Sequence, residues 1–330
     1  MAPEAAGAPW GEAGRVAWRG LLLAIVVVVM VLVARVVVGQ WDAVRVSAAG
    51  LRPHSGWLAL SSALVLASYV LLIQTWRYVL ASTGERLDFT TAARIWFVSS
   101  FGKYVPGKVW AITAMSVMAG RAGVSPVAAA GSSIVVQLLN VAAGFAVMIA
   151  AGGEALRGDL AWARPVAIAA VLLSLATLAL APFALPRALA LVGRWTHRPL
   201  SFRTMPAGAL WIAALGNVLA WVLYGVAFRL FSRAILGEAT GATAGYVAVY
   251  TSSYLFGYLA FFAPGGVGVR EGALVALLPR FGLASFGDAV LLAALSRLWL
   301  TVLEIVPGLL FLAREGLRAR PTQTVDDGSP

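Results

Sequence analysis

The sequence predicts an all-α polytopic membrane protein built from two inverted repeats, and three observations support this class. Of its 330 residues, 61% are hydrophobic and only 12% are charged, against about a quarter in an ordinary soluble domain. Apolar runs of about 20 residues, the length that crosses a bilayer, recur along the chain. Two further apolar stretches are interrupted by Pro-Gly and charged residues. Each repeat is therefore expected to be a span, a broken hairpin and a second span.

The composition excludes several kinds of site. The chain has no cysteine, and its two histidines, His54 and His197, fall in expected loops. Neither a metal centre nor a histidine general base is therefore expected within the membrane, and no cofactor or catalytic residue is predicted. The net charge of +11 comes from basic residues beside apolar runs. This placement is typical of topology signals and anionic-lipid contacts, and not of nucleic-acid binding.

Long apolar runs with few charged residues define the expected crossings. Residues 1–19 are rich in Ala, Gly and Pro and are expected to form a disordered cytoplasmic N-terminus. The first run, 21–39, follows Arg15 and Arg19 and is too long for a cleaved signal peptide, so a retained signal-anchor helix is expected. A polar tail, 314–330, is expected to follow the transmembrane domain of residues 20–313. The remaining crossings are expected at 57–80, 126–151, 165–185, 206–231 and 285–312.

Two other apolar stretches, 91–119 and 243–279, are interrupted near their middle. Residues 103–108 split the first and residues 264–272 split the second. Proline and glycine stop helices, and charge within lipid is costly. Each stretch is therefore expected to form a helix–break–helix hairpin, with protein or water around the broken backbone. The alternative is a surface loop that joins two ordinary helices.

Basic residues set the expected orientation in the cell membrane. Arginines cluster in the loop 187–205 and again after residue 313, and such clusters mark the cytoplasmic side. Placing both clusters in the cytoplasm together with the N-terminus requires about six full crossings, provided that each hairpin returns to the side it entered. If a hairpin crosses instead, about seven or eight spans result.

The two halves 57–151 and 206–312 share a sequence pattern. From residue 76 the first half has Trp-Arg, Gly, Ser-Ser-Phe, Pro-Gly and Arg-Ala-Gly-Val in order. From residue 228 the second has Phe-Arg, Gly, Ser-Ser-Tyr, Pro-Gly and Arg-Phe-Gly-Leu. The extra crossing at 165–185 separates the halves, so their membrane orientations are expected to be opposite. Inverted repeats whose broken helices meet near the bilayer midplane are typical of secondary transporters.

The first break contains both lysines of the chain. Lys103 and Lys108 flank Pro106 and Gly107. Elsewhere the chain uses arginine and no lysine. This placement indicates a need for compact ammonium charges, and we predict that these four residues bind substrate. The alternative is that the lysines contact lipid phosphates at the membrane surface.

The second break is rich in glycine, which permits unusual backbone angles, and a helix is expected to follow it. Backbone amides at such a helix start form a concave site for anions. Arg270 adds a cation, with which Glu271 is expected to pair. The substrate-binding residues predicted in this break are Pro264, Gly265, Gly266, Gly268, Arg270 and Glu271.

The last span of each repeat carries a stripe of polar and small residues at a spacing of 4, 3 and 4: Ser133, Gln137, Asn140 and Gly144, then Arg297, Thr301, Glu304 and Gly308. This spacing keeps one helical face, which should point at protein or water because lipid would not solvate it. Gln137/Asn140 and Arg297/Glu304 are predicted to bind substrate and to face each other across the repeat interface. The alternative is polar helix–helix packing, which is favoured for a weaker pair, Asn217 and Tyr224.

These breaks also carry a family resemblance. The run Phe261-Phe-Ala-Pro-Gly-Gly-Val-Gly-Val-Arg-Glu-Gly-Ala-Leu274, with Leu295-Ser-Arg297 and Glu304, resembles the flippase-like transmembrane domain of lysylphosphatidylglycerol synthases. Phe101-Gly-Lys-Tyr-Val-Pro-Gly-Lys-Val-Trp110 is similar to the first-half motif of that family. The resemblance covers roughly residues 20–313 and implies a domain that moves lipids between leaflets. The chain ends soon after its last span, so the soluble synthase domain and its activity are not expected.

The leading functional prediction is a lipid translocator for an anionic-headed phospholipid or a polyprenyl-phosphate-linked lipid, with membrane lipids as its partners. A non-transporting accessory subunit of a lipid-modifying or glycosyltransferase enzyme is the alternative. A membrane-embedded transferase is less favoured, because the few carboxylates expected in the membrane form no clustered acidic motif. No nucleotide-binding motif is present, so direct use of ATP is not expected.

Overall fold

The computed structural model describes residues 53–104, 109–153, 205–260 and 263–318, together with isolated positions between 164 and 187. The terminal segments 1–19 and 319–330, the crossing expected at 21–39 and most of the one at 165–185 lie outside the described residues. The same holds for residues 105–108 of the first break.

Every element in the described part of the chain is helical, which confirms the predicted all-α class. Helices long and apolar enough to cross a membrane are Ser55–Ser82, Pro126–Ala151, Ala207–Leu236 and Phe286–Arg314, and they match four of the expected spans. The elements in chain order are α3 (Ser55–Ser82), α4 (Phe89–Ser99), η1 (Ser100–Tyr104), α5 (Val109–Arg121), α6 (Pro126–Ala151), α8 (Ala207–Leu236), α9 (Thr243–Leu259), η2 (Pro264–Gly266), α10 (Val269–Arg280) and α11 (Phe286–Arg318).

Both interrupted stretches are broken where the sequence predicts. The pair α4 and α5 has 11 and 13 residues, and the pair α9 and α10 has 17 and 12 residues. A helix rises about 1.5 Å per residue, so each of these helices is shorter than the roughly 30 Å hydrocarbon core. Helices of this length fit hairpins that turn back within the membrane better than they fit full crossings.

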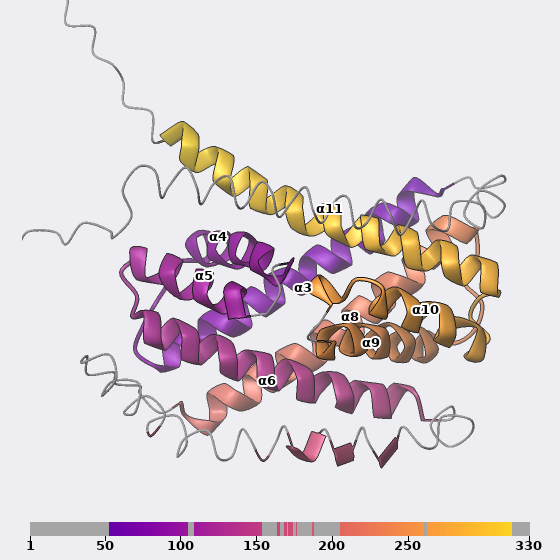
Figure 1. The fold of residues 1–330 in the computed structure, drawn as a ribbon, viewed down its shortest axis with the longest axis horizontal. Coiled ribbons are helices and arrows are strands. Elements are labelled where there is room, and N and C mark those ends of the chain that lie inside the picture. Colours follow the sequence, from indigo (N-terminus) through magenta and orange to yellow (C-terminus); the bar gives the residue numbers. More distant parts are fainter. Residues whose placement is uncertain are drawn as a thin grey trace, which may run out of the picture.

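The two helix pairs approach each other from opposite ends of the molecule. In Figure 1 the α4–α5 pair lies on the left and the α9–α10 pair on the right. Their breaks, η1 and η2, meet near the middle and contact each other. Helix α11 runs along one side of both pairs and α6 along the other side (Figure 1). The middle of the molecule is therefore where broken backbone from both halves comes together.

Helices α3 and α8, the first helices of the two halves, pack against each other in antiparallel fashion. The Ser61 hydroxyl donates to the carbonyl of Ala227 at 2.6 Å. Further along, a Cβ on Gly216 would stand 2.5 Å from Thr75 Oγ1. From residue 61 to residue 75 of α3, the contacting residue of α8 changes from 227 to 216, so the chain direction of α8 is opposite to that of α3. Equivalent helices thus run in opposite directions, as an inverted repeat requires.

The turn before the last helix of each half has the same backbone hydrogen bonds. Gly123 N–H donates to the carbonyl three residues earlier, that of Gly120, at 3.1 Å. Val124 N–H donates to the carbonyl five residues earlier, that of Ala119, at 3.1 Å. Gly282 and Leu283 repeat both bonds at 2.9 and 3.0 Å. Both glycines have positive φ, 82° and 63°, the conformation that ends a helix in this motif. This equivalence supports a duplication that the sequence indicated from few positions.

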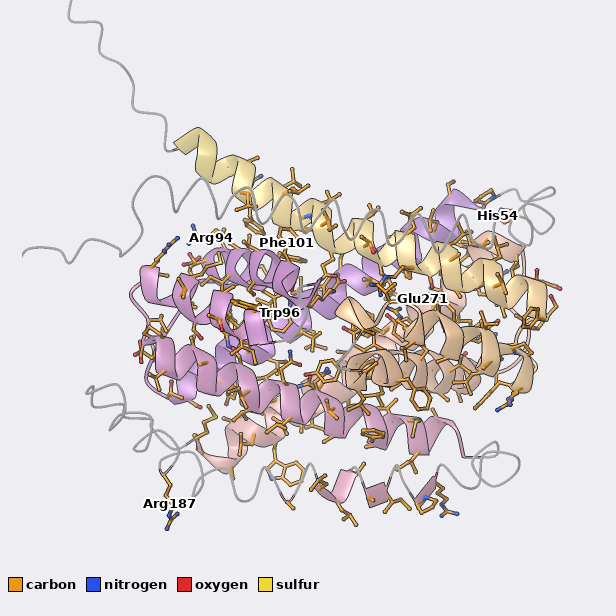
Figure 2. The ribbon with its side chains drawn as sticks, in the orientation of Figure 1. His54, Arg94, Trp96, Phe101, Arg187 and Glu271 are labelled. Atoms are coloured by element: carbon orange, nitrogen blue, oxygen red, sulfur yellow. The ribbon has the colours of Figure 1, made fainter. Side chains whose placement is uncertain are left out.

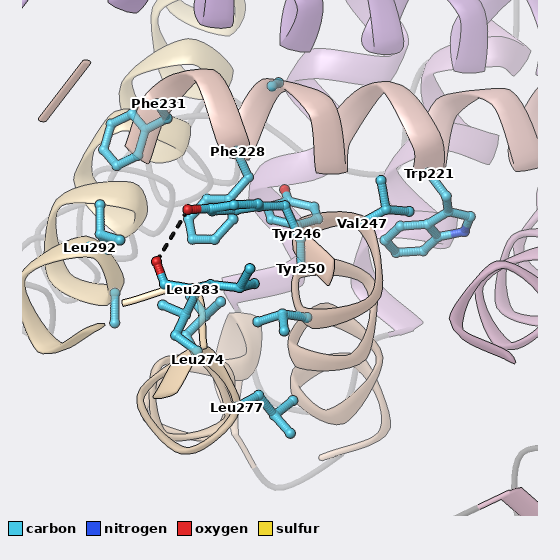
Figure 3. Close-up of a cluster of buried hydrophobic side chains, with 14 of the residues drawn as sticks. Trp221, Phe228, Phe231, Tyr246, Val247, Tyr250, Leu274, Leu277, Leu283 and Leu292 are labelled. Atoms are coloured by element: carbon cyan, nitrogen blue, oxygen red, sulfur yellow. Dashed lines mark hydrogen bonds between the residues drawn. The ribbon is translucent and has the colours of Figure 1, made fainter. Parts of the chain in front are cut away.

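An aromatic core holds the second half together. Phe228 of α8 lies against Tyr246 and Tyr250 of α9, as Figure 3 shows, and Phe231 stacks on Phe228. All four side chains are almost fully buried. The Tyr246 hydroxyl donates to the carbonyl of Leu283 at 3.3 Å, so a buried polar group has its partner. This bond ties the turn that precedes α11 to α9.

Candidate functional site

The backbone of the second break requires glycine for two separate reasons. Gly265, Gly266 and Gly268 have φ values of 58°, 69° and 83°, in the left-handed region that side chains disfavour. At Gly266 a Cβ would also stand 2.8 Å from the carbonyl oxygen of Gly257 on α9. The unusual backbone angles expected from the sequence are confirmed, and η2 lies directly against α9.

Glu271 caps the helix that follows this break. Its Oε2 accepts a hydrogen bond from Gly268 N–H at 2.6 Å, and its Oε1 lies 3.6 Å from Arg297 Nη1 on α11. Figure 2 places Glu271 near the middle of the molecule, beneath α11. Two expectations are corrected here. The ion pair of Glu271 is with Arg297, not with Arg270, and the first amide expected to serve an external anion already has this carboxylate as its partner.

Arg297 connects α11 to the second break. Its Nη1 donates to the carbonyl of Gly265 at 3.0 Å, and the residue is 8% exposed. Its Nε and Nη2 are buried without a hydrogen-bond partner among the described residues. Buried polar groups are nearly always paired, so two unused donors on one guanidinium indicate an acceptor that the described residues do not supply.

Arg270, near the start of α10, lies over two aromatic rings of α9. Its guanidinium carbon is 5.1 Å from the ring centroids of both Tyr250 and Tyr254, a cation–π arrangement. The residue is 7% exposed, and its Nη2 has no partner among the residues that the structure describes. Arg270 and Arg297 thus bring unsatisfied donors to one glycine-rich turn.

A cluster of tyrosines extends from Arg270 across three helices. Tyr224 of α8 stacks on Tyr250 at 5.8 Å and meets Tyr69 of α3 edge-on at 6.1 Å. Tyr69, Tyr250 and Tyr254 were not predicted as site residues from the sequence, although Tyr250 and Tyr254 are four residues apart on one helical face. Tyr224 was predicted to be a packing residue, and in the structure it packs against the rings of Tyr69, Trp221 and Tyr250.

The first break reaches the same helix, α11. Lys103 of η1 forms an ion pair with Glu304; the side chains are 35% and 9% exposed. Four residues along α11, a Cβ on Gly308 would stand 2.5 Å from Cζ of Phe101, which Figure 2 labels at the inner end of the α4–α5 pair. The other predicted residues of this break, Pro106, Gly107 and Lys108, lie outside the described residues.

Helix α11 therefore contacts both breaks through its predicted stripe. Arg297, Thr301, Glu304 and Gly308 are all buried, so the expectation that this face avoids lipid is confirmed. Thr301 donates to the carbonyl of Arg297 in its own helix, at 2.7 Å. Arg297 reaches the second break and Glu304 the first, so one helix face joins the two.

The α6 stripe has different neighbours. Ser133 contacts Met115 Sδ of α5 at 2.7 Å, and Gly144 lies against Trp221 of α8. Gln137 and Asn140 are half-buried. Because α6 and α11 lie on opposite sides of the helix pairs (Figure 1), the two stripes do not face each other as expected; the hairpins stand between them.

The charges at the centre do not balance. Lys103, Arg270 and Arg297 supply three positive charges, and Glu271 and Glu304 supply two negative charges. The described part of the site thus carries one excess positive charge, largely buried. Among the described residues no group of three or more His, Cys, Asp or Glu side chains could hold a metal ion. Excess charge and unused guanidinium donors suit the binding of an anion.

Comparison with known proteins identifies a family. A family model described as "Lysylphosphatidylglycerol synthase TM region" matches residues 19–308. This range includes both breaks, α3, α6 and α8, and most of α11. No curated protein matches the chain. The matched region is the transmembrane part of that synthase, in agreement with the resemblance seen in the sequence.

Proposed function

The chain belongs to the lysylphosphatidylglycerol synthase transmembrane family, and we propose that it moves an anionic-headed lipid between the leaflets of the cell membrane. The observation that carries this proposal is the pair of buried arginines, Arg270 and Arg297, whose unused donors lie at the meeting point of two helix breaks. We assign it a transport role, with no chemical step of its own.

A lipid phosphate must exchange its water for other contacts before it enters the hydrocarbon core. An unpaired charge in an apolar medium is very unfavourable, and charge-assisted hydrogen bonds from guanidinium groups are strong replacements. Arg270 and Arg297 supply such donors from the second break. Lys103 supplies a cation from the first. A headgroup that enters from either leaflet would therefore meet a cation where the two breaks come together.

The opposed hairpins suggest how access could alternate. Each break is joined to α11, the first through Lys103 and Glu304 and the second through Arg297 and Gly265. Passage of a headgroup requires that these contacts open one after the other. Rocking of one repeat against the other would expose the centre to one side and then to the opposite side. The acyl chains stay in lipid beside the exposed apolar faces of the long helices.

Reconstituted vesicles test the proposal. The purified protein is placed in liposomes that contain a fluorescent phosphatidylglycerol, and dithionite quenches the label in the outer leaflet. We expect Arg297→Gln to slow lipid movement about tenfold or more, because a charge-assisted hydrogen bond contributes at least that much. Arg280→Gln is the matched control, since Arg280 is exposed at the end of α10.

Two outcomes would count against the proposal. Equal rates for Arg297→Gln and the unaltered protein would remove Arg297 from the lipid path. No lipid movement by the unaltered protein, for phosphatidylglycerol or for a polyprenyl phosphate, would favour the accessory-subunit role, and binding to a lipid-modifying or glycosyltransferase enzyme would then be the property to measure.

A further inference from the structure

The position of Glu271 has a consequence for which lipid the site accepts. Building on the proposed lipid transport, we propose that Glu271 is an internal counter-ion that the headgroup phosphate replaces, and that it makes the site selective for a singly charged phosphodiester lipid. The inference rests on the partners of this carboxylate, on the unused donors around it and on the charge at the centre.

The partners of Glu271 are those that a phosphate would use. A helix N-terminus with a glycine-rich turn is a common anion site, and α10 begins with such a turn. Glu271 Oε2 takes the Gly268 amide at 2.6 Å. Its Oε1 lies 3.6 Å from Arg297 Nη1, beyond ordinary hydrogen-bond distance. The carboxylate thus forms a full hydrogen bond with the Gly268 amide but only a longer ionic contact with Arg297.

The donors left over exceed what one carboxylate can satisfy. Arg297 Nε and Nη2 and Arg270 Nη2 are buried and have no partner among the described residues. Arg297 and Arg270 are 8% and 7% exposed, so water reaches them little. A tetrahedral phosphate offers more acceptor oxygens than a carboxylate, and these can satisfy donors from two arginines at once. Exchange of Glu271 for phosphate would therefore increase the number of satisfied donors.

The charge of the described site limits which phosphate fits. The three cations and two carboxylates leave one excess positive charge. A phosphodiester carries one negative charge and neutralises this excess in the described part of the site. A phosphomonoester carries about −1.5 to −2 at pH 7, and its second charge would lie among Glu271 and Glu304. Repulsion between like charges in a poorly solvated site is strong, so Glu271 disfavours the monoester.

Titration calorimetry on the full chain in detergent tests the inference. The probes are dioctanoyl phosphatidylglycerol, a diester, dioctanoyl phosphatidic acid, a monoester, and glycerophosphoglycerol, the same diester without acyl chains. For the unaltered protein we expect the tightest binding with dioctanoyl phosphatidylglycerol. In Glu271→Gln we expect both lipids to bind more tightly, and phosphatidic acid to gain by at least about tenfold, because one negative charge is removed from the site.

The variants are chosen so that folding and charge can be separated. Glutamine still accepts a hydrogen bond from the helix-start amide, so Glu271→Gln should keep the cap of α10. Glu238→Gln removes the same charge at an exposed loop position and should leave both affinities unchanged. If Glu271→Gln fails to fold, the preference of the unaltered protein decides, and binding of phosphatidic acid as tight as that of phosphatidylglycerol overturns the inference.

The remaining outcomes separate this inference from the proposed function. Lipid movement by the unaltered protein together with unchanged lipid preference in Glu271→Gln would overturn the role of Glu271 and leave the transport function standing. A changed preference without lipid movement would support the binding site and contradict transport. Equal affinity for glycerophosphoglycerol and dioctanoyl phosphatidylglycerol would assign the site to soluble phosphodiesters and overturn the lipid class.

Discussion

Replacing Gly266 by alanine should destabilise the protein more than replacing Gly268, the other positive-φ glycine of the second break whose Cβ surroundings are known. The new Cβ would stand 2.8 Å from the carbonyl oxygen of Gly257 and 2.9 Å from its Cα, and backbone cannot move aside as a side chain can. The φ of 69° costs a non-glycine residue about 1–2 kcal/mol. Overpacking adds roughly 1–3 kcal/mol, so the total loss is about 2–5 kcal/mol.

Gly268→Ala separates the two contributions. Gly268 has a φ of 83°, but a Cβ there would meet nothing within 4 Å, so only the backbone term of about 1–2 kcal/mol remains. Gly208→Ala near the start of α8, where a Cβ also meets nothing within 4 Å, sets the baseline. The free energy of unfolding is measured by titration with SDS in mixed micelles. Equal losses for Gly266→Ala and Gly268→Ala would refute the close packing of η2 on α9.

Two further predictions concern orientation and the central ion pair. Because α3 and α8 run antiparallel, the loops that follow them, which contain Arg86 and Glu238, should lie on opposite sides of the membrane. The chain has no native cysteine, so single cysteines introduced at these two positions should label from opposite sides. Labelling of both from one side would contradict the inverted arrangement. Lys103→Met should lower the free energy of unfolding by about 3 kcal/mol, because buried Glu304 loses its ion pair with Lys103. Glu304→Gln should lower it by roughly 1 kcal/mol, because Lys103 still reaches water. Equal losses in the SDS titration would refute this asymmetry.

Much of the fold could be predicted from the sequence because the bilayer limits the alternatives. An apolar run of about 20 residues has few structures open to it, and the four described spans lie where they were expected. Both breaks could be predicted as well, because proline and glycine interrupt helices and charge within lipid is costly. The stripe from Arg297 to Gly308 was also predictable, since a charged side chain on a membrane helix must face protein.

The contacts between elements distant in sequence could not be predicted in the same way. Spacing along one helix shows which residues share a face, but not which neighbour that face meets. The α6 stripe was therefore assigned to the wrong neighbour. The pairing of Glu271 with Arg297 across 26 positions depends on how α11 passes over η2, and sequence proximity favoured Arg270 instead. The tyrosine cluster was missed because aromatic residues on membrane helices are common as packing residues.

The proposed route is tested most directly by a cross-link that joins the first break to α11. Phe101→Cys with Gly308→Cys places two thiols where Phe101 Cζ now stands 2.5 Å from the Cβ position of residue 308, and the charged centre is left intact. A bifunctional methanethiosulfonate about as long as a phenylalanine side chain joins them, and a reducing agent releases them. Loss of phosphatidylglycerol movement on cross-linking, with recovery on reduction, is the predicted result. Movement at the same rate in cross-linked and reduced vesicles would contradict passage between the breaks.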